Sequence, residues 1–307
     1  MAFYRFEPRM HQLLSELVAG ELAAPGRPDL AEELSVTWLL HPEGPQGEAV
    51  GASLGGERMR YPASVVKLVY AVAVEAWLQA DLLLEHDELR RAMADMIRDS
   101  SNDATALLVD LLTGTTGGPD LPEPDWSLWC DQRQLVNRWL EELGWEELRG
   151  FNACQKTWGD GPYGREWRHY GADLSNRNRM GTLGTARLLH AVMTDAVVSP
   201  PACRRLRDLL SRSLDPRERV ADPENQVDGF LGGGIPVTAG LWSKAGWMSQ
   251  ARHDAAWIEI EDLPPMLIVA FSEGAERAAD ETLLPDLAAG LAAAARRLDE
   301  EPESEAE

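Results

Sequence analysis

The sequence predicts an α/β protein of the α+β type, in which an antiparallel five-stranded sheet is flanked by helices and joined to an all-helical lobe. Two observations predict this fold class. Segments typical of strands occur only towards the two ends of the chain, and a long block of helical segments separates them. Strands segregated in this way are expected to build one sheet from distant parts of the chain.

The N-terminal part supplies one helix and two strands. Apolar residues at helical spacing predict a helix over 9–22. The stretches 34–40 and 49–54 are typical of strands, and a turn rich in proline and glycine separates them.

The middle of the chain is helical. After Pro62, a long apolar helix is expected over about 64–84. Two segments interrupt the helical block and are expected to be loops, the Gly/Pro-rich 114–124 and the polar, Trp-rich 151–179. The remaining helices are expected at 87–97, 104–112, 132–148, 183–196 and 202–214.

Three strands and a helix complete the pattern. The strands are expected at 240–247, 255–262 and 266–271, the helix at 283–298 and an acidic, disordered tail at 299–307. We therefore expect one two-lobed domain over 1–298. Its sheet lobe would comprise 1–63 and 216–298, and its helical lobe 64–215.

The charge and residue composition restrict the classes of molecule that this protein is expected to bind. A net charge of −22 repels phosphate backbones and anionic lipids, which argues against nucleic acid and membrane partners and leaves a small-molecule or peptide-like substrate. Neither the six histidines nor the three cysteines show metal-ligand spacing, so we expect no cofactor. The first 22 residues contain no uninterrupted apolar run, which predicts a cytoplasmic protein without a signal peptide. The oligomeric state stays open.

Lysine is rare in this chain. Lysine and arginine together number 29, but only Lys67, Lys156 and Lys244 are lysines. Arginine keeps its proton at physiological pH, whereas a lysine can be tuned to release one. The three lysines are therefore the first candidates for proton transfer, although Lys156 has no motif around it and is expected at the surface.

Ser64 and Lys67 form the first candidate pair. A spacing of three places both side chains on one helix face, and the helix N-terminus offers free N–H groups to the serine. Apolar neighbours predict a partly buried Lys67 with a lowered pKa, which would make it a usable base. The alternative is a helix-capping serine beside a surface lysine.

Two further elements follow along the chain. Ser100-Ser101-Asn102 lies between two predicted helices, where a hydroxyl and an amide could serve a leaving group and a substrate carbonyl, or could simply cap the next helix. Lys244 lies in a predicted strand and is followed by Ala245 and Gly246, which would let substrate approach the backbone. An edge-strand lysine that deters aggregation is the alternative.

Together these elements resemble the Ser-x-x-Lys, Ser-Asp-Asn and Lys-Thr-Gly motifs of class A β-lactamases and penicillin-binding proteins. The resemblance spans roughly residues 10–298 and implies the fold of these serine hydrolases. It implies that Ser64 is the nucleophile, Lys67 its activating amine and Ser100 a proton donor to the leaving group. Asn102 would bind a substrate amide, and Lys244 would give electrostatic support.

The resemblance also implies a substrate-binding strand. Ala245, Gly246 and Trp247 would line the cleft, and Arg252 on the next strand would meet a substrate carboxylate. The backbone N–H groups of Ser64 and Trp247 would form an oxyanion hole.

Several positions depart from the family pattern. Ser101 stands in place of aspartate, Ala245 in place of threonine or serine, and Trp247 in place of a small residue. The Glu-x-x-Leu-Asn loop that directs the deacylating water is not recognisable. Glu166, which lies 17 positions before Leu183, is the candidate for that role, and Asp173 is the rival.

The expected function is acyl-enzyme chemistry on an amide, peptide or β-lactam-like substrate. Two alternatives remain open. One is a cytoplasmic amidase resembling serine-dependent glutaminases, and the other is a non-catalytic binding protein that keeps the fold with Trp247 partly filling the cleft.

Overall fold

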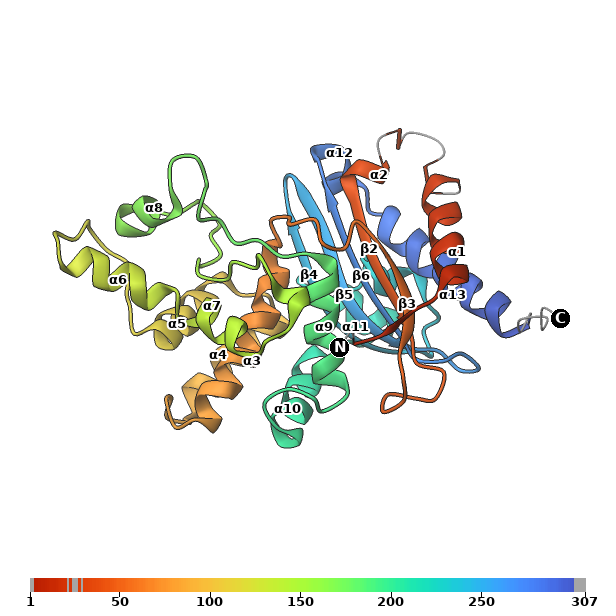
Figure 1. Cartoon of the computed structure of the whole chain (residues 1–307), viewed down its shortest axis with the longest axis horizontal. Coiled ribbons are helices and arrows are strands. Elements are labelled where there is room, and N and C mark those ends of the chain that lie inside the picture. The colour runs from red at the N-terminus through yellow and green to blue at the C-terminus, as the bar shows by residue number, and fades with distance from the viewer. Residues whose placement is uncertain (1–2, 21, 24–26, 29, 301–307) are drawn as a thin grey trace.

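The computed structural model describes residues 3–20, 22–23, 27–28 and 30–300. Within these residues, six strands form one sheet in the order β1-β3-β2-β6-β5-β4 (Figure 1). The strands are β1 (Arg5–Phe6), β2 (Leu34–Leu40), β3 (Val50–Leu54), β4 (Gly240–Met248), β5 (Ala251–Glu259) and β6 (Met266–Glu273).

The prediction of five antiparallel strands is wrong in one respect. The five expected strands are present, and each pairs antiparallel with its neighbour in the sheet. The two-residue strand β1 adds a sixth and pairs parallel with β3, so the sheet is mixed. A strand of two residues is too short to show an alternating pattern in the sequence.

The helices occupy most of the predicted segments. In the sheet half of the chain they are α1 (Pro8–Ala19), α2 (Leu30–Glu33), α11 (Pro216–Ala221), α12 (Ala275–Ala279) and α13 (Leu283–Glu300). In the middle block they are α3 (Val66–Gln79), α4 (Asp87–Arg98), α5 (Asn102–Thr113), α6 (Asp125–Arg133), α7 (Leu135–Glu142), α8 (Gly164–Tyr170), α9 (Thr182–Met193) and α10 (Pro200–Leu210). Short 3₁₀ helices are η1 (Ala63–Val65), η2 (Glu146–Leu148) and η3 (Leu231–Gly234).

The predicted boundaries fail mainly in the middle block. The expected helix 132–148 is divided, because α7 ends before Gly144, which has a φ of 66° that suits glycine. The expected loop 151–179 contains the short helix α8. Of the predicted tail, Asp299 and Glu300 continue α13, and residues 301–307 lie outside the described residues.

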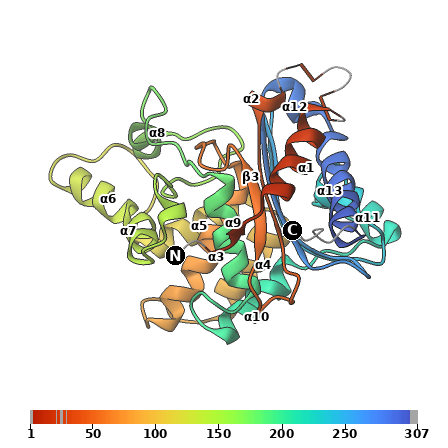
Figure 2. The same ribbon diagram turned by 45° about the vertical axis from the view of Figure 1, so that its right-hand side comes forward.

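The sheet separates two apolar cores. Successive residues of β6 alternate between them, with Leu267, Val269 and Phe271 in one and Met266 and Ile268 in the other. This alternation follows from the period of two in a strand. Figure 2 shows α1 and α13 on one face of the sheet and α9 with the middle helices on the other.

The helix α3 is buried nearly all round, since almost every residue from Val66 to Val74 is apolar and inaccessible to solvent. It carries Lys67 in its first turn. The residue Ser101 is the N-cap of α5, and its hydroxyl accepts a hydrogen bond from the Ala104 N–H at 3.2 Å. These two helices and the edge strand β4 position the candidate site.

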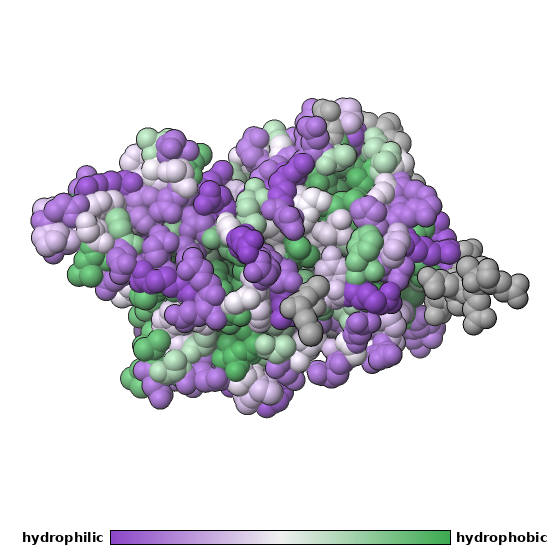
Figure 3. Space-filling view, in the orientation of Figure 1, coloured by the Kyte–Doolittle hydropathy of each residue, from purple (hydrophilic) through white to green (hydrophobic). Residues whose placement is uncertain are grey.

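The outer surface is mainly polar. Hydrophilic side chains cover most of the face shown in Figure 3, and hydrophobic ones gather in separate patches. Among the described residues, no helix is both long and apolar enough to cross a bilayer.

A buried and a partly buried histidine make the stability sensitive to acid. His41 and His190 stack with ring centroids 5.2 Å apart, and neither His41 nitrogen has a hydrogen-bond partner among the described residues. Burial lowers the pKa of His41 to about 4 and that of His190 to about 3. An imidazole in the unfolded chain takes up its proton near pH 6.5.

The free energy of unfolding should therefore be highest above pH 6.5 and fall as the pH drops towards 4. Each such histidine contributes a slope of roughly 1.4 kcal/mol per pH unit in this window. Urea unfolding at several pH values should show a smaller slope in His41→Phe than in the unsubstituted chain. Equal slopes would contradict the assignment.

Candidate active site

One pocket of about 570 Å³ collects most of the predicted site residues. Ser64, Ser100 and Asn102 line it from the helical side. Across the pocket, the strand residues Ala245, Gly246, Trp247 and Arg252 complete the predicted part of the lining. The structure thus brings together residues that are up to 188 positions apart, and it also recruits a segment, residues 223–230, that was not predicted.

Ser64 is held in the turn that leads into α3. It is half-buried in η1, immediately before α3. Its neighbour Ala63 has a φ of 46°, a left-handed conformation that is unfavourable for a residue with a side chain. Gly246 of β4 packs against this turn so closely that a Cβ there would lie 2.9 Å from the Ser64 nitrogen. The strand can approach the serine only because residue 246 is glycine.

Lys67 is completely buried one turn further along α3. Its amine donates to the Ser100 carbonyl, to the Ser100 hydroxyl at 3.2 Å and to Asn102 Oδ1 at 2.9 Å. Burial lowers the pKa of Lys67 to about 7, although the charge of Glu224 opposes this change. A substantial fraction of this amine is therefore neutral at physiological pH.

Ser100 lies between two amines. Lys244 is also completely buried, and its amine donates to the same Ser100 hydroxyl at 3.0 Å. Because this hydroxyl oxygen accepts from both lysines, its own hydrogen is free to point into the pocket. Ser100 has a φ of 55°, so the backbone here is also left-handed.

Gln226 fixes Lys244, and sequence reasoning missed it. Its Oε1 accepts from the Lys244 amine and from the Ala245 N–H, while its Nε2 donates to the carbonyls of Ile97 and Arg98. Burial lowers the pKa of Lys244 well below the ordinary lysine value, and the nearby positive charge of Lys67 adds to this effect.

The strand β4 is the last strand at one edge of the sheet. Arg212 donates its backbone N–H to the Leu241 carbonyl and its side chain to the Ser243 carbonyl, and Gln226 accepts from the Ala245 N–H. Outward-facing backbone groups alternate along an antiparallel strand. The N–H of Trp247 belongs to the same outward-facing set as residues 241, 243 and 245, beside the turn that holds Ser64.

Arg252 lines the pocket, but its guanidinium nitrogens already contact oxygen atoms of the protein. Its Nε donates to the Ala278 carbonyl at 2.9 Å, its Nη1 donates to the Gly229 carbonyl at 3.3 Å, and its Nη2 lies 3.5 Å from Glu281. Trp247 is 60% exposed, and its indole N–H donates to the same Ala278 carbonyl. Neither side chain closes the pocket.

The structure does not bring Glu166 or Asp173 to this pocket. Glu166 lies in α8, towards the outer end of the helical lobe, where it is completely buried and paired with Arg133 and Lys156 (Figure 1). Asp173 is exposed in a turn, where it accepts from the Ser175 N–H. Lys156 is buried, which contradicts its expected surface position, and its amine lies 2.7 Å from Asp110.

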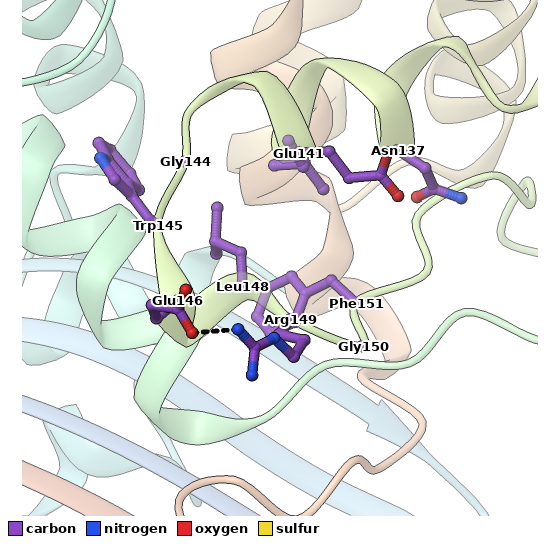
Figure 4. A pocket seen from close by; sticks show the side chains of 10 residues that line it. Asn137, Glu141, Gly144, Trp145, Glu146, Leu148, Arg149, Gly150 and Phe151 are labelled. Carbon is purple, nitrogen blue, oxygen red and sulfur yellow. Dashed lines mark hydrogen bonds and ion pairs between the residues drawn. The ribbon is translucent and has the colours of Figure 1, made fainter.

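A second, smaller pocket of about 250 Å³ contains none of the predicted site residues. It lies over the segment from α7 to Phe151, where Glu146 and Arg149 face each other as an ion pair (Figure 4). The part of the chain that the structure describes contains no group of three or more histidine, cysteine or acidic side chains arranged to hold a metal ion.

The buried position of Glu166 generates a stability prediction. Replacing Glu166 with glutamine keeps the side-chain shape but removes the negative charge that faces Arg133, which is 0% exposed. Breaking a buried ion pair is strongly destabilising, so urea unfolding of Glu166→Gln should show a loss of about 3 kcal/mol. The exposed Asp173→Asn is the control and should lose much less. Equal effects would contradict a structural role for Glu166.

Comparison with known proteins gives one matching family model, described as the β-lactamase enzyme family, over residues 85–295. No curated protein matches the chain.

Solved structures share the fold across nearly the whole chain. A β-lactamase from Sphaerobacter thermophilus has 18% identity and a TM-score of 0.60, covering 91% of this chain and 97% of that one. PBP-A has 16% identity and a TM-score of 0.62, covering 96% and 98%. A β-lactamase from Xanthomonas campestris has 19% identity and a TM-score of 0.58, covering 92% and 97%. The chain belongs to the β-lactamase enzyme family.

Proposed function

We propose that this protein is a serine hydrolase that forms an acyl-enzyme at Ser64 with an amide, peptide or β-lactam-like substrate. One observation carries the proposal. Ser64 and Ser100 line one pocket, and the amines of two buried lysines both donate to the Ser100 hydroxyl. Membership of the β-lactamase family supports the same class of chemistry.

Acylation begins with proton transfer from Ser64. The Ser64 oxygen attacks the substrate carbonyl carbon while the neutral form of Lys67 takes the hydroxyl proton. The lowered pKa of Lys67, about 7, supports this role because a base needs a free electron pair at working pH. The N–H groups of Ser64 and Trp247 would stabilise the oxygen of the tetrahedral intermediate.

Collapse of the intermediate needs a proton on the leaving group. The Ser100 hydroxyl is the donor in this proposal, because its hydrogen is free to point into the pocket while its oxygen accepts from both amines. The proton that Lys67 received from Ser64 would replace it. Lys244 would hold Ser100 and stabilise developing negative charge, and the Asn102 amide nitrogen would bind a substrate carbonyl.

Hydrolysis of the acyl-enzyme completes the cycle. The water oxygen bonds to the ester carbonyl carbon, the bond from that carbon to the Ser64 oxygen breaks, a proton of the water passes to the Ser64 oxygen, and the carboxylic acid is released. We do not assign the activation of this water to Glu166, because Glu166 is committed to Arg133 and Lys156 outside the pocket. We propose instead that Glu166 anchors α8 to the helical lobe.

Labelling tests the proposal. A fluorophosphonate probe or a fluorescent penicillin, followed by peptide mass mapping, should give an adduct on Ser64 that is absent in Ser64→Ala. A chain that no probe labels would contradict the hydrolase proposal and favour the binding-protein alternative.

The pH profile tests the role of Lys67. Because the neutral amine is the active form, the labelling rate should rise with pH, reach half its maximum near pH 7 and level off above that value. In Lys67→Arg the side chain keeps its proton, so the rate should fall by roughly 10²–10⁴-fold. Lys156→Arg is the matched control and should keep the rate. Equal rates in the two variants would exclude Lys67 as the base.

A further inference from the structure

The charged groups that line the pocket are mostly acidic. Glu224 and Asp228 line it from the segment 223–230, and Glu281 lines it beside Arg252. All three acidic residues are exposed to solvent. No hydrogen bond or ion pair engages the Glu224 side chain in the described part of the chain, so its charge is available to a ligand.

Arg252, the one arginine that lines the pocket among the described residues, is not free to bind an anionic group of a ligand. Arg252 is only 5% exposed, and its three nitrogens face the Ala278 carbonyl, the Gly229 carbonyl and Glu281. A guanidinium binds a carboxylate best through two parallel hydrogen bonds from a free fork. Ala245 in the same wall has no hydroxyl to assist. Asp228 is paired with Arg219 at 3.3 Å and Glu281 with Arg252 at 3.5 Å, so an anionic substrate group would meet two neutralised carboxylates and the unpaired charge of Glu224.

Two aromatic rings lie beside Arg252 in the pocket lining. Phe230 and Trp247 both line the pocket, and the Arg252 guanidinium lies 5.1 Å and 6.0 Å from their ring centroids. Aromatic faces attract cations, and carboxylates beside them strengthen the attraction. Trp247 is 60% exposed, whereas Phe230 is 8% exposed, so part of the Trp247 ring is open to a ligand.

Of the three carboxylates, Glu224 is the one tied to the leaving-group side of the proposed reaction, because its charge acts on Lys67 and its segment contacts Lys244. The Lys244 amine donates hydrogen bonds to the Ser100 hydroxyl and to Gln226 Oε1. In the chain, Gln226 follows Glu224 and Asn225. The proton donor to the leaving group is therefore connected through Lys244 and Gln226 to the segment that carries Glu224.

We infer that the pocket selects substrates whose leaving group carries a positive charge, an ammonium or guanidinium group, over the carboxylate-bearing leaving group of a penicillin. This inference rests on the proposed acyl-enzyme function at Ser64 and adds its substrate class.

Three phenylacetyl esters provide the test. Their phenol leaving groups carry a meta trimethylammonium, tert-butyl or carboxylate substituent, and each ester transfers the same phenylacetyl group to Ser64. Release of the phenol gives the acylation rate, which is divided by the rate with hydroxide alone to remove differences in intrinsic reactivity. We expect the cationic ester to exceed the anionic one by at least about tenfold in kcat/KM, and added salt to reduce this ratio.

A matched pair of variants locates the effect. In the pocket variant, Glu224→Gln, Asp228→Asn and Glu281→Gln are combined, and the preference for the cationic ester should disappear. The control variant removes the same number of exposed charges elsewhere, through Glu88→Gln, Glu141→Gln and Glu142→Gln, and should keep the preference. Loss of the preference in both variants would assign it to the overall charge and overturn the inference.

The outcomes separate this inference from the function on which it rests. If the neutral ester acylates Ser64 but the cationic ester has no advantage, the charge selectivity is overturned and the hydrolase proposal stands. If none of the three esters acylates Ser64, both are overturned.

Discussion

The site depends on the Ser100 hydroxyl, which lies between the amines of two completely buried lysines. A buried amine is costly unless oxygens surround it. Lys67 finds its oxygens on Ser100 and Asn102, and Lys244 finds its own on Ser100, Gln226 and the Ala245 carbonyl. Satisfying both lysines therefore requires α3, the junction of α4 with α5, and β4 to meet at one point.

The same convergence accounts for the local irregularities. Ala63 and Ser100 both take left-handed backbone conformations, and these are the residues that set the direction of the Ser64 turn and the Ser100 side chain. Such conformations persist where surrounding contacts over-determine them, and they are frequent in functional sites. Gly246 allows β4 to pack against the Ser64 turn, because a side chain at this position would push β4 away from Ser64.

The sequence predicted the parts of the site that have short-range signals. Ser64 and Lys67 are three residues apart on one helix, and Lys244 stood out because the chain has only three lysines. Gln226 could not be found in this way, since its role arises from contacts with Ile97 and Lys244 that no local pattern encodes.

Glu166 was predicted at the pocket, but it lies elsewhere in the structure. Its spacing from Leu183 suggested a place at the pocket, but its partner Arg133 lies 33 positions earlier in the chain, and the pairing depends on the packing of α8. The fold was predicted more fully than the site, because the five longer strands and most helices carry strong periodic patterns. The strand β1 and the break at Gly144 have no such pattern and were missed.

Family membership and chemistry rest on different parts of the chain. The family model matches residues 85–295, downstream of Ser64 and Lys67, whereas the solved structures share the fold over more than nine-tenths of the chain at less than 20% identity. The structure, rather than the family model, therefore places Ser64 in the pocket lining and the Lys67 amine against Ser100 and Asn102 of that lining.

The most direct test of this account is the ionisation of Lys67 in the folded protein. Because the chain has three lysines, labelling lysine with ¹³C at Cε should give three NMR signals, and Lys67→Arg identifies the one that belongs to Lys67. The account predicts that this signal titrates with a midpoint near pH 7. A midpoint near 10.5, the ordinary value of an exposed lysine, would contradict it.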